Sequence, residues 1–372
     1  MNKGPASFDF RPSAPASTGV EMEWILVDQA TGAQTPLAPQ LLSSLAPSPR
    51  IKAELFTSMI EVNTAIHHST SGCMHELDTL YTTLHSAVTP LGGGLLASGT
   101  HPFSHWQQQQ ISGDPRYARL LARLQWMARR FNIFGIHVHV GMPDGDSCIR
   151  VMNRLLPVMP AFLAISANSP FWHGHDTGLS AARIKVFEGL SQGGMPFYFN
   201  DWRDFEHCAA RLLATGSIDS IRDIWWEMRP HPDFGTLEIR IGDMPLTRAD
   251  TAAYIAYVRA ECMAALCDTT NGNRVHPSLI RENRWRACRH GMHMEFIDPA
   301  SETAYPFLDW LDKRLAWLDA HGASHEDLAI VRGQLARWRQ DGDGATRQRA
   351  LRQKHAEPDS MIAAMRTQDG WG

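Results

Sequence analysis

A chain of 372 residues, 44% hydrophobic and 20% charged, can form one large domain or two average ones with a sizeable core. Its formal net charge of -4 gives no general reason to expect nucleic-acid or anionic-membrane binding, and no apolar run approaches the length of a membrane span. Its six scattered cysteines form no C-x-x-C pair, which is typical of reduced thiols. The composition therefore predicts a soluble, cytoplasmic protein.

The N-terminal quarter of the chain is expected to combine a tail with the first strands. Residues 1–18 are rich in Pro, Ala and Ser and lack the apolar segment of a signal peptide, so they are expected to form a flexible tail. One strand is predicted over 20–27, and one or two more over 52–64. Apolar residues at helical spacing predict a helix over 71–88, and a strand over 95–98 follows a glycine break.

The middle of the chain alternates predicted helices and strands. A helix with Pro at its start is expected over 115–131, followed by a strand over 134–142. A second helix is expected over 146–167, divided by its two prolines. Residues 168–200 are rich in Gly and Pro and are expected to form a long, ordered functional loop.

The last part of the chain is predicted to become entirely helical. In chain order we expect a helix over 202–213, strands over 225–229 and 236–241, and a helix over 248–267. Beyond Pro277 no strand is expected. Because we find neither an internal repeat nor a linker, residues 19–372 are predicted to form a single α+β domain whose helical part covers about 275–372.

Three predicted strands share one pattern, in which two ionisable residues are separated by one apolar residue. Residues i and i+2 of a strand point to the same face, so each pair is expected on one face and its apolar neighbours on the other. Taken alone, each pair is also typical of a half-solvated strand in an antiparallel sheet. The pairs are Glu21 with Glu23, His137 with His139, and Glu238 with Arg240.

The paired glutamates indicate a cation site. Two carboxylates about 4 Å apart repel by roughly 4 kcal/mol at an effective dielectric constant near 20, so a partly buried Glu21–Glu23 pair needs a cation. Carboxylate oxygens, with an occasional imidazole, are natural magnesium ligands. Glu54 and Glu61 add two acids of opposite parity, and only a turn or bulge, expected at residues 57–58, would bring both to one site.

Taken in order, the motifs resemble the type 2 glutamate–cysteine ligase family, from about Gly19 to the C-terminus. The matching segments are Gly19-Val20-Glu21-Met22-Glu23, Glu54 to Thr64, Gly99-Thr100-His101-Pro102-Phe103, Gly135 to Gly141, Asp176-Thr177-Gly178 with Arg183, and Arg229 to Arg240. The resemblance implies an α+β, glutamine synthetase-like fold. In this fold a curved, largely antiparallel sheet carries the active site on its concave face, helices pack behind it, and residues 19–372 form one catalytic ligase domain.

The resemblance also implies roles for individual residues. Metal ligands for Mg²⁺, with Mn²⁺ as a substitute, would be Glu21, Glu23, Glu61, His137 and Glu238. His139 would contact the nucleotide or the substrate. Clamps for phosphate or for a substrate carboxylate would be Arg183, Arg229 and Arg240, of which Arg183 and Arg240 would also bind ATP. Glu54 and Glu227 receive no role.

The predicted reaction is ATP-dependent ligation of a carboxylate to an amine through an acyl phosphate. The resemblance implies L-glutamate and L-cysteine as substrates and γ-glutamylcysteine as product. The expected partners are small molecules, without nucleic acid or membrane, and a homodimer is the expected assembly. Two alternatives stay open: a metal-dependent amide hydrolase, and a non-catalytic ATP-binding protein on the same scaffold.

Overall fold

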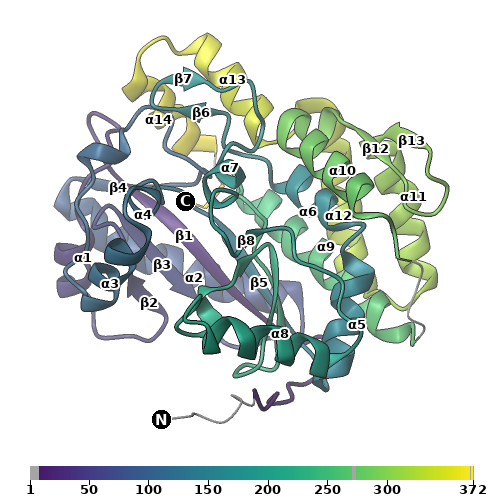
Figure 1. Cartoon of the computed structure of the whole chain (residues 1–372). Helices are drawn as coiled ribbons and strands as arrows, with labels where there is room; N and C mark the ends of the chain where they lie inside the picture. The colour runs from purple at the N-terminus through teal and green to yellow at the C-terminus, as the bar shows by residue number, and fades with distance from the viewer. Residues whose placement is uncertain (1–7, 270–273, 369, 372) are drawn as a thin grey trace.

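The computed structural model describes residues 8–269, 274–368 and 370–371 and is built around one seven-stranded sheet (Figure 1). The strand order is β10-β11-β5-β1-β3-β2, β4 also pairs with β1, and all neighbours run antiparallel. The strands are β1 (Thr18–Asp28), β2 (Ile51–Ala53), β3 (Met59–Asn63), β4 (Gly93–Leu96), β5 (Ile136–Gly141), β10 (Met228–His231) and β11 (Thr236–Ile239). The predicted antiparallel sheet is thus confirmed.

Strand β1 is the centre of the sheet and divides it into an apolar and a polar face. Val20, Met22 and Trp24 are buried, whereas Glu21 and Glu23 between them are partly exposed. This alternation is the period of two that a strand with one buried face requires. The ring of Trp24 lies 5.2 Å from that of Tyr81 in helix α2 (Thr70–Val88), so the apolar face packs on the helices.

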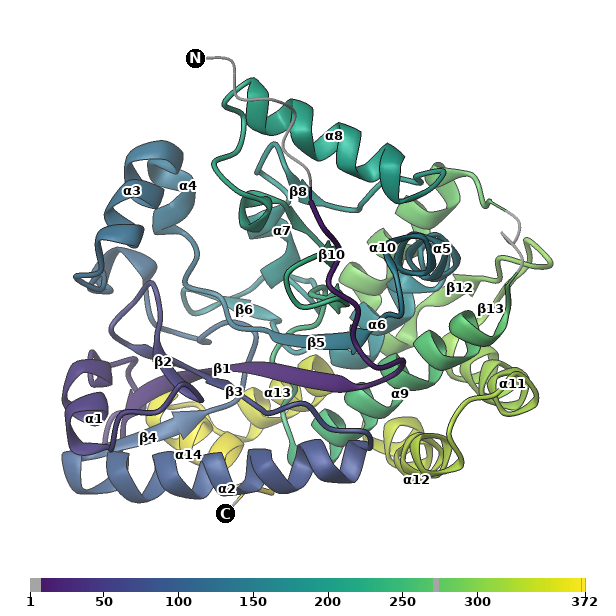
Figure 2. The same cartoon turned by 90° about the horizontal axis from the view of Figure 1, so that it is seen from below.

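Helices cover the apolar face of the sheet, as predicted (Figure 2). They are α2 (Thr70–Val88), α9 (Arg248–Cys267), α13 (Gly344–Lys354) and α14 (Pro358–Gln368), with α12 (His325–Asp341) packed on α9. The side chain of Ser69 caps α2 by accepting a hydrogen bond from the Gly72 amide, and Thr247 caps α9 in the same way. Helix α9 begins and ends where the sequence pattern predicts.

The predicted helix over 146–167 is divided at its prolines. Helix α5 (Gly145–Leu155) and helix α6 (Met159–Ser166) meet at 67°, because Pro157 and Pro160 cannot continue a helical ladder. Among the described residues, no single helix is long and apolar enough to cross a membrane. Helices α5 and α6 reach the length and hydropathy of a membrane span only when the bent pair is counted as one segment.

On the polar side, two predictions need correction. The single helix expected over 115–131 is two helices, α3 (Pro115–Leu124) and α4 (Trp126–Arg129), because Gln125 adopts a φ of 50°. The loop expected over 168–200 contains short elements: β6 (Phe171–Trp172), β7 (His175–Asp176), α7 (Arg183–Phe187) and β8 (Gly193–Gly194). The remaining elements before β10 are α1 (Ala38–Ser44), α8 (Trp202–Ala214) and β9 (Trp225–Trp226), with 3-10 turns η1 (Thr89–Leu91), η2 (Trp106–Gln108) and η3 (Ile221–Asp223).

The C-terminal part is helical except for one hairpin, so the expectation of no strand beyond Pro277 is wrong. The hairpin pairs β12 (Glu295–Ile297) with β13 (Ala304–Pro306) between α10 (Pro277–His290), η4 (Gly291–His293) and α11 (Phe307–Ala320). It is anchored by Phe296, whose ring lies 4.0 Å from that of Trp310. Strands of three residues are too short to show an alternating pattern in the sequence.

The N-terminal segment 8–17 lies along the polar side of the sheet. The Phe8 amide donates to Glu206 of α8 at 2.7 Å, and the Arg11 amide donates to the Pro232 carbonyl at 3.0 Å. Gly235 has a φ of 62°, and a Cβ there would lie 1.8 Å from the Arg11 carbonyl oxygen, so the β10–β11 turn needs glycine to accept this segment. Of the tail predicted over 1–18, residues 1–7 lie outside the described residues, and Thr18 begins β1.

Candidate active site

The predicted site residues form cross-strand pairs on the polar face of the sheet. Glu21 of β1 lies opposite His137 of β5, and Glu23 lies opposite Glu61 of β3. Glu238 of β11 lies opposite His139 of β5. The same-face interpretation of the paired residues is confirmed, and the antiparallel register brings residues from four strands into one cluster.

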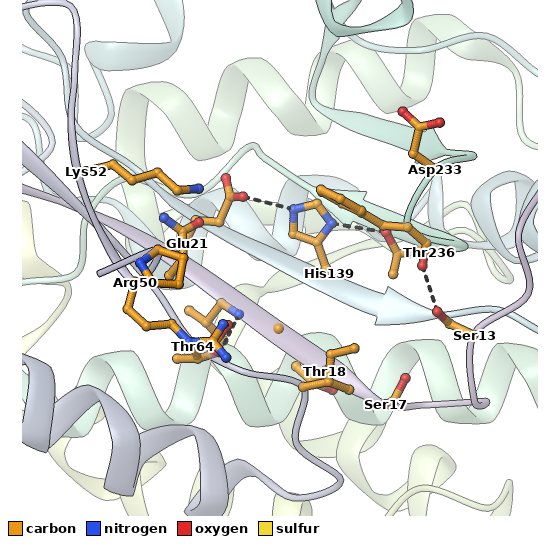
Figure 3. Close-up of a pocket in the computed structure, with 16 residues that line it drawn as sticks. Ser13, Ser17, Thr18, Glu21, Arg50, Lys52, Thr64, His139, Asp233 and Thr236 are labelled. Carbon is orange, nitrogen blue, oxygen red and sulfur yellow. Dashed lines mark hydrogen bonds and ion pairs between the residues drawn. The ribbon is translucent and has the colours of Figure 1, made fainter. Parts of the chain in front are cut away.

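His139 lies between two carboxylates. Its Nε2 atom is 3.6 Å from Glu21 Oε1, and its Nδ1 atom is 3.0 Å from the Thr236 hydroxyl (Figure 3). The same Nε2 atom is 3.7 Å from Glu238 Oε1. Within the described residues, this buried Nε2 has no hydrogen-bond partner. Burial opposes protonation of His139, but the charges of Glu238 and Glu21 prevail and raise its pKa. The cluster thus attracts positive charge.

These three residues fit a divalent cation. One ligand atom from each of Glu21, His139 and Glu238 lies within 4.8 Å of the others, and two carboxylates with an imidazole suit magnesium or manganese. Because the Thr236 hydroxyl can accept the Nδ1 proton of His139, Nε2 is free to serve as a ligand. From the sequence, His139 is interpreted as a contact for the nucleotide or the substrate. Its place among the candidate metal ligands follows from the pairing of β5 with β11, which sets it opposite Glu238.

A second group of acids lies on the other side of Glu21. Glu23, Glu54 and Glu61 line one cavity, and the chain turns at residues 57–58, as required for Glu54 and Glu61 to meet. Burial raises the pKa of Glu23 to about 7, although the charge of Arg183 opposes the shift. Burial and neighbouring carboxylates also raise the pKa values of Glu54 and Glu61. These acids therefore lack sufficient positive charge from the protein.

The other titratable groups of the cluster favour metal binding. Burial raises the pKa of Glu21, but the hydrogen bond with His137 and the close contact with His139 outweigh it, and the net shift is well downward. Burial, helped by the charge of Arg240, lowers the pKa of His137 to about 4. At neutral pH, Glu21 is therefore an anion and His137 a neutral imidazole, the forms in which both side chains bind metals.

The three predicted arginines differ in their surroundings. Arg229 donates from Nε and Nη2 to Glu238 Oε2 at 2.9 and 2.7 Å, and from Nη1 to two backbone carbonyls at 3.0 Å. Arg240 pairs with the other oxygen of Glu238 and lines the cavity that holds Glu23. Arg183, the first residue of α7, is buried, donates to the Ile241 carbonyl at 3.4 Å, and is not among the described cavity-lining residues. Only Arg240 faces a ligand space.

Glu227, which received no role, has a structural partner. Arg284 of α10 donates to both of its carboxylate oxygens from Nε, at 2.8 and 2.9 Å, and both side chains are buried. The pair joins the strand end to the C-terminal helices.

Two cavities meet at Glu21. The first, of about 430 Å³, is called the strap cavity because Ser13 and Ser17 of the N-terminal segment line it together with His139 and Phe234 (Figure 3). The second, of about 480 Å³, is called the acidic cavity. Its lining includes Glu23, Glu54, Glu61, His137, Arg240 and one face of α3. Glu21 therefore faces ligands arriving from either side.

Comparison with known proteins supports the resemblance carried by these motifs. The model of the glutamate–cysteine ligase family 2 (GCS2) matches residues 17–367. The chain belongs to this family. It is 41% identical over 368 residues to "Putative glutamate--cysteine ligase 2" of Gloeobacter violaceus, covering 96% of both chains. It is 40% identical over 299 residues to a similarly named protein of Frankia alni, covering 77% of this chain and 78% of the relative.

Solved structures show the same fold. Glutamate–cysteine ligase from Francisella tularensis, solved in complex with AMP, superposes with a TM-score of 0.72 at 13% identity, over 97% of this chain and 90% of that one. A bifunctional glutathione synthetase from Pasteurella multocida gives 0.73 at 13% identity, over 95% of this chain and 52% of that one. The predicted glutamine synthetase-like fold is confirmed. Family membership makes the protein an ATP-dependent carbon–nitrogen ligase.

Proposed function

We propose that this ligase joins L-glutamate to L-cysteine through a γ-glutamyl phosphate and releases ADP and phosphate. The observation that carries the proposal is the position of Glu21, which lines both cavities and belongs to the candidate cation cluster. Phosphoryl transfer between two substrates requires the donor and the acceptor to meet beside one neutralising charge. A carboxylate between two adjoining cavities meets that requirement.

The metal ligands are proposed from both acid groups. Glu21, His139 and Glu238 would hold one Mg²⁺ or Mn²⁺ ion, and Glu23, Glu61 and His137 would hold further metal on the side of the acidic cavity. Such ions would neutralise the phosphate oxygens and the developing charge. Arg229 would act as a positioning residue, because it fixes the Glu238 carboxylate.

In the proposed reaction, a carboxylate oxygen of glutamate attacks the γ-phosphorus of ATP, and the bond to the ADP oxygen breaks. The deprotonated amine of cysteine then attacks the acyl carbon, the carbon–oxygen bond to phosphate breaks, and an amide remains. Arg240 would stabilise the transferring phosphoryl group, since its guanidinium faces the cavity beside Glu238. The site supplies charge and positioning in place of a covalent nucleophile.

The comparisons support this choice of substrates. The relatives' names specify glutamate and cysteine, and the Francisella tularensis ligase was solved with AMP. All six cysteines are free thiols, which fits the reducing cytoplasm as the proposed location. A homodimer stays a prediction that sedimentation would check.

A panel of amino acids and amines tests the proposal. The protein is incubated with ATP, magnesium, glutamate and each amine; phosphate release is measured and products are identified by mass spectrometry. We expect γ-glutamylcysteine, and no product when a chelator removes the metal. Amide cleavage without ATP would support the hydrolase alternative, and ATP binding without any product would support the non-catalytic one.

A further inference from the structure

Arg183 is a buried arginine without an ion-pair partner among the described residues. The residue is 3% exposed, its Nη1 donates to the Ile241 carbonyl at 3.4 Å, and its Nε has no hydrogen-bond partner in the described chain. The other buried arginines in the described part of the chain each pair with a carboxylate; they are Arg229, Arg259, Arg284 and Arg347. Because a buried cation is costly unless it is paired, Arg183 is a candidate for a functional role.

The guanidinium of Arg183 packs against Gly135. It fills the space that a side chain at this position would need, because a Cβ built on Gly135 would clash with Arg183 Nη2. Gly135 in turn bonds Glu23 twice. Its amide donates to Glu23 Oε2 at 2.6 Å, and its carbonyl accepts from the Glu23 amide at 3.1 Å. Arg183 therefore lies directly behind the residue that holds the Glu23 carboxylate.

The charge of Arg183 acts on two carboxylates, Glu23 and Asp243. Burial raises the pKa of Glu23 to about 7 and that of Asp243 to about 6, and Arg183 is the strongest opposing influence on both. Ser169 fixes the start of α7 near these acids, since its hydroxyl donates to Asp243 at 2.6 Å and accepts from the Arg183 amide at 3.0 Å. The protein thus holds this cation near two acids without pairing it to either.

Arg183 lies one layer behind the acidic cavity. Phe187, whose ring is 5.7 Å from the guanidinium carbon of Arg183, lines that cavity, whereas Arg183 does not. Residues behind a metal ligand fix its orientation, and their loss typically weakens metal binding about ten- to a hundredfold. The Gly135 amide holds one oxygen of Glu23 and thereby fixes the direction of the other.

We propose that Arg183 is a positioning residue for Glu23, which acts through Gly135 to present this carboxylate to a divalent cation in the acidic cavity. The inference rests on the metal role proposed for Glu23. It places Arg183 out of contact with ATP and the substrates, so Arg183 should control metal affinity even when no substrate is present.

Calorimetric titration of the protein with Mn²⁺, without ATP or amino acids, tests this role. Glu23→Gln identifies the site in the titration, because that site should lose affinity. Arg183→Met removes the charge and the contact with Gly135 but keeps much of the side-chain volume, and it should weaken Mn²⁺ binding at this site about ten- to a hundredfold. Arg183→Lys keeps the charge and should restore part of the affinity.

Gly135→Ala tests the same contact from the other side, because it keeps the arginine but displaces its guanidinium. It should also weaken Mn²⁺ binding. Since both substitutions break one contact, the double variant should lose little more than the larger single loss. Gly333→Ala is the matched control, because a Cβ there meets no atom within 4 Å, and it should bind Mn²⁺ like the wild type.

Arg347→Met controls for the loss of a buried arginine far from Glu23 in the fold. It should lower the melting temperature and keep the Mn²⁺ affinity of the folded protein, whereas a merely structural Arg183 would behave in the same way. The inference is overturned if Arg183→Met binds Mn²⁺ within about twofold of the wild type, or if the two single losses add in the double variant. Where Arg183→Met does not fold, near-normal Mn²⁺ binding by Gly135→Ala overturns it. Unchanged Mn²⁺ affinity in Glu23→Gln would instead refute the metal role of Glu23, and the inference with it.

Discussion

Buried acids occur in two regions of this protein, and the described residues neutralise them more completely in one region than in the other. Behind the sheet, Asp250 of α9 accepts hydrogen bonds from Gln334 and Trp338 at 2.9 Å and pairs with Arg347 at 2.5 Å. Glu261 accepts two hydrogen bonds from Arg314, at 2.9 and 2.7 Å. These acids are saturated by the protein, and their role is to hold helices together.

On the polar face of the sheet, carboxylates face one another. Glu23, Glu54 and Glu61 share one cavity, and burial keeps the pKa of Glu23 near 7. Leaving buried charges unneutralised costs stability, and such strain is retained where a ligand relieves it. The difference teaches that a shortage of cationic partners, rather than burial, sets Glu23, Glu54 and Glu61 apart from the acids behind the sheet, while Glu238, with two arginine partners, lies between the two classes.

The largest effect is expected on the free energy of unfolding, from the paired acids behind the sheet. Arg347→Met leaves Asp250 buried without its cation and should lower the free energy of unfolding by about 3–5 kcal/mol. Chemical denaturation measures the change. Arg349→Met, on the same helix, removes a more exposed pair with Asp176 and should cost less than about 1 kcal/mol. Equal losses in the two variants would break the comparison.

The second largest effect is expected on turnover, from the carboxylates on the polar face of the sheet. Glu21→Gln or Glu23→Gln should lower turnover at least a hundredfold, or about 2.7 kcal/mol of transition-state stabilisation. The melting temperature should hold or rise for Glu23→Gln, because the carboxylate removed there has a raised pKa. It should fall slightly for Glu21→Gln, because His137 and His139 favour the charged form of that carboxylate. Steady-state kinetics with magnesium or manganese and thermal melts check both expectations. A variant with near-normal turnover would remove its glutamate from the proposed metal ligands.

A smaller effect is expected for Arg240→Lys. The ammonium of lysine keeps the charge but cannot reproduce the planar guanidinium, so the maximal rate should fall about ten- to a hundredfold, or about 1.4–2.7 kcal/mol. The melting temperature should change little. If the rate at saturating ATP stays within twofold of wild type, Arg240 is a structural partner of Glu238.

The smallest expected effect is a pH dependence that arises from Glu23. Because a cation must displace the proton held with a pKa of about 7, magnesium affinity should rise about tenfold from pH 6 to pH 8. Without metal, Glu23 keeps its proton up to about pH 7 in the folded state but loses it near pH 4.5 in the unfolded chain. The free energy of unfolding that Glu23 contributes should therefore fall as pH rises from about 4.5 to 7. Calorimetric titration and thermal melts measure both trends, and Glu23→Gln should flatten them.

The sequence indicates this fold well where the patterns are long. The bounds of α9 match the prediction, and the period of two in β1 assigns its faces correctly. Prediction from the sequence fails where local backbone geometry breaks a pattern, as at Gln125 between α3 and α4. It also fails where a strand is as short as β12. Three residues contain no measurable period.

The candidate site is only partly contained in the sequence. Same-face pairs follow from strand parity, which correctly groups Glu21 with Glu23. The contact of His139 with Glu238 depends on the register between β5 and β11, and no local pattern fixes it. Likewise, the clamp roles of Arg183 and Arg229 stay predictions. The hydrogen-bond partners of these arginines cannot be read from the sequence; in the structure, the bond from Arg229 to Glu238 favours a role in positioning that carboxylate.

The pairing of β1 with strands far along the chain has a consequence for biosynthesis. His137 follows Glu21 by 116 residues, and the partner strand of β5 is later still. Contacts of such high sequence separation form late and slowly, since loop closure must precede them. While the ribosome is still making the first third of the chain, Glu21 has no histidine beside it and Glu238 has not been synthesised. The candidate cation cluster of Glu21, His139 and Glu238 is therefore assembled only in the last steps of folding, so a cation that binds all three residues would stabilise the chain only once those steps are complete.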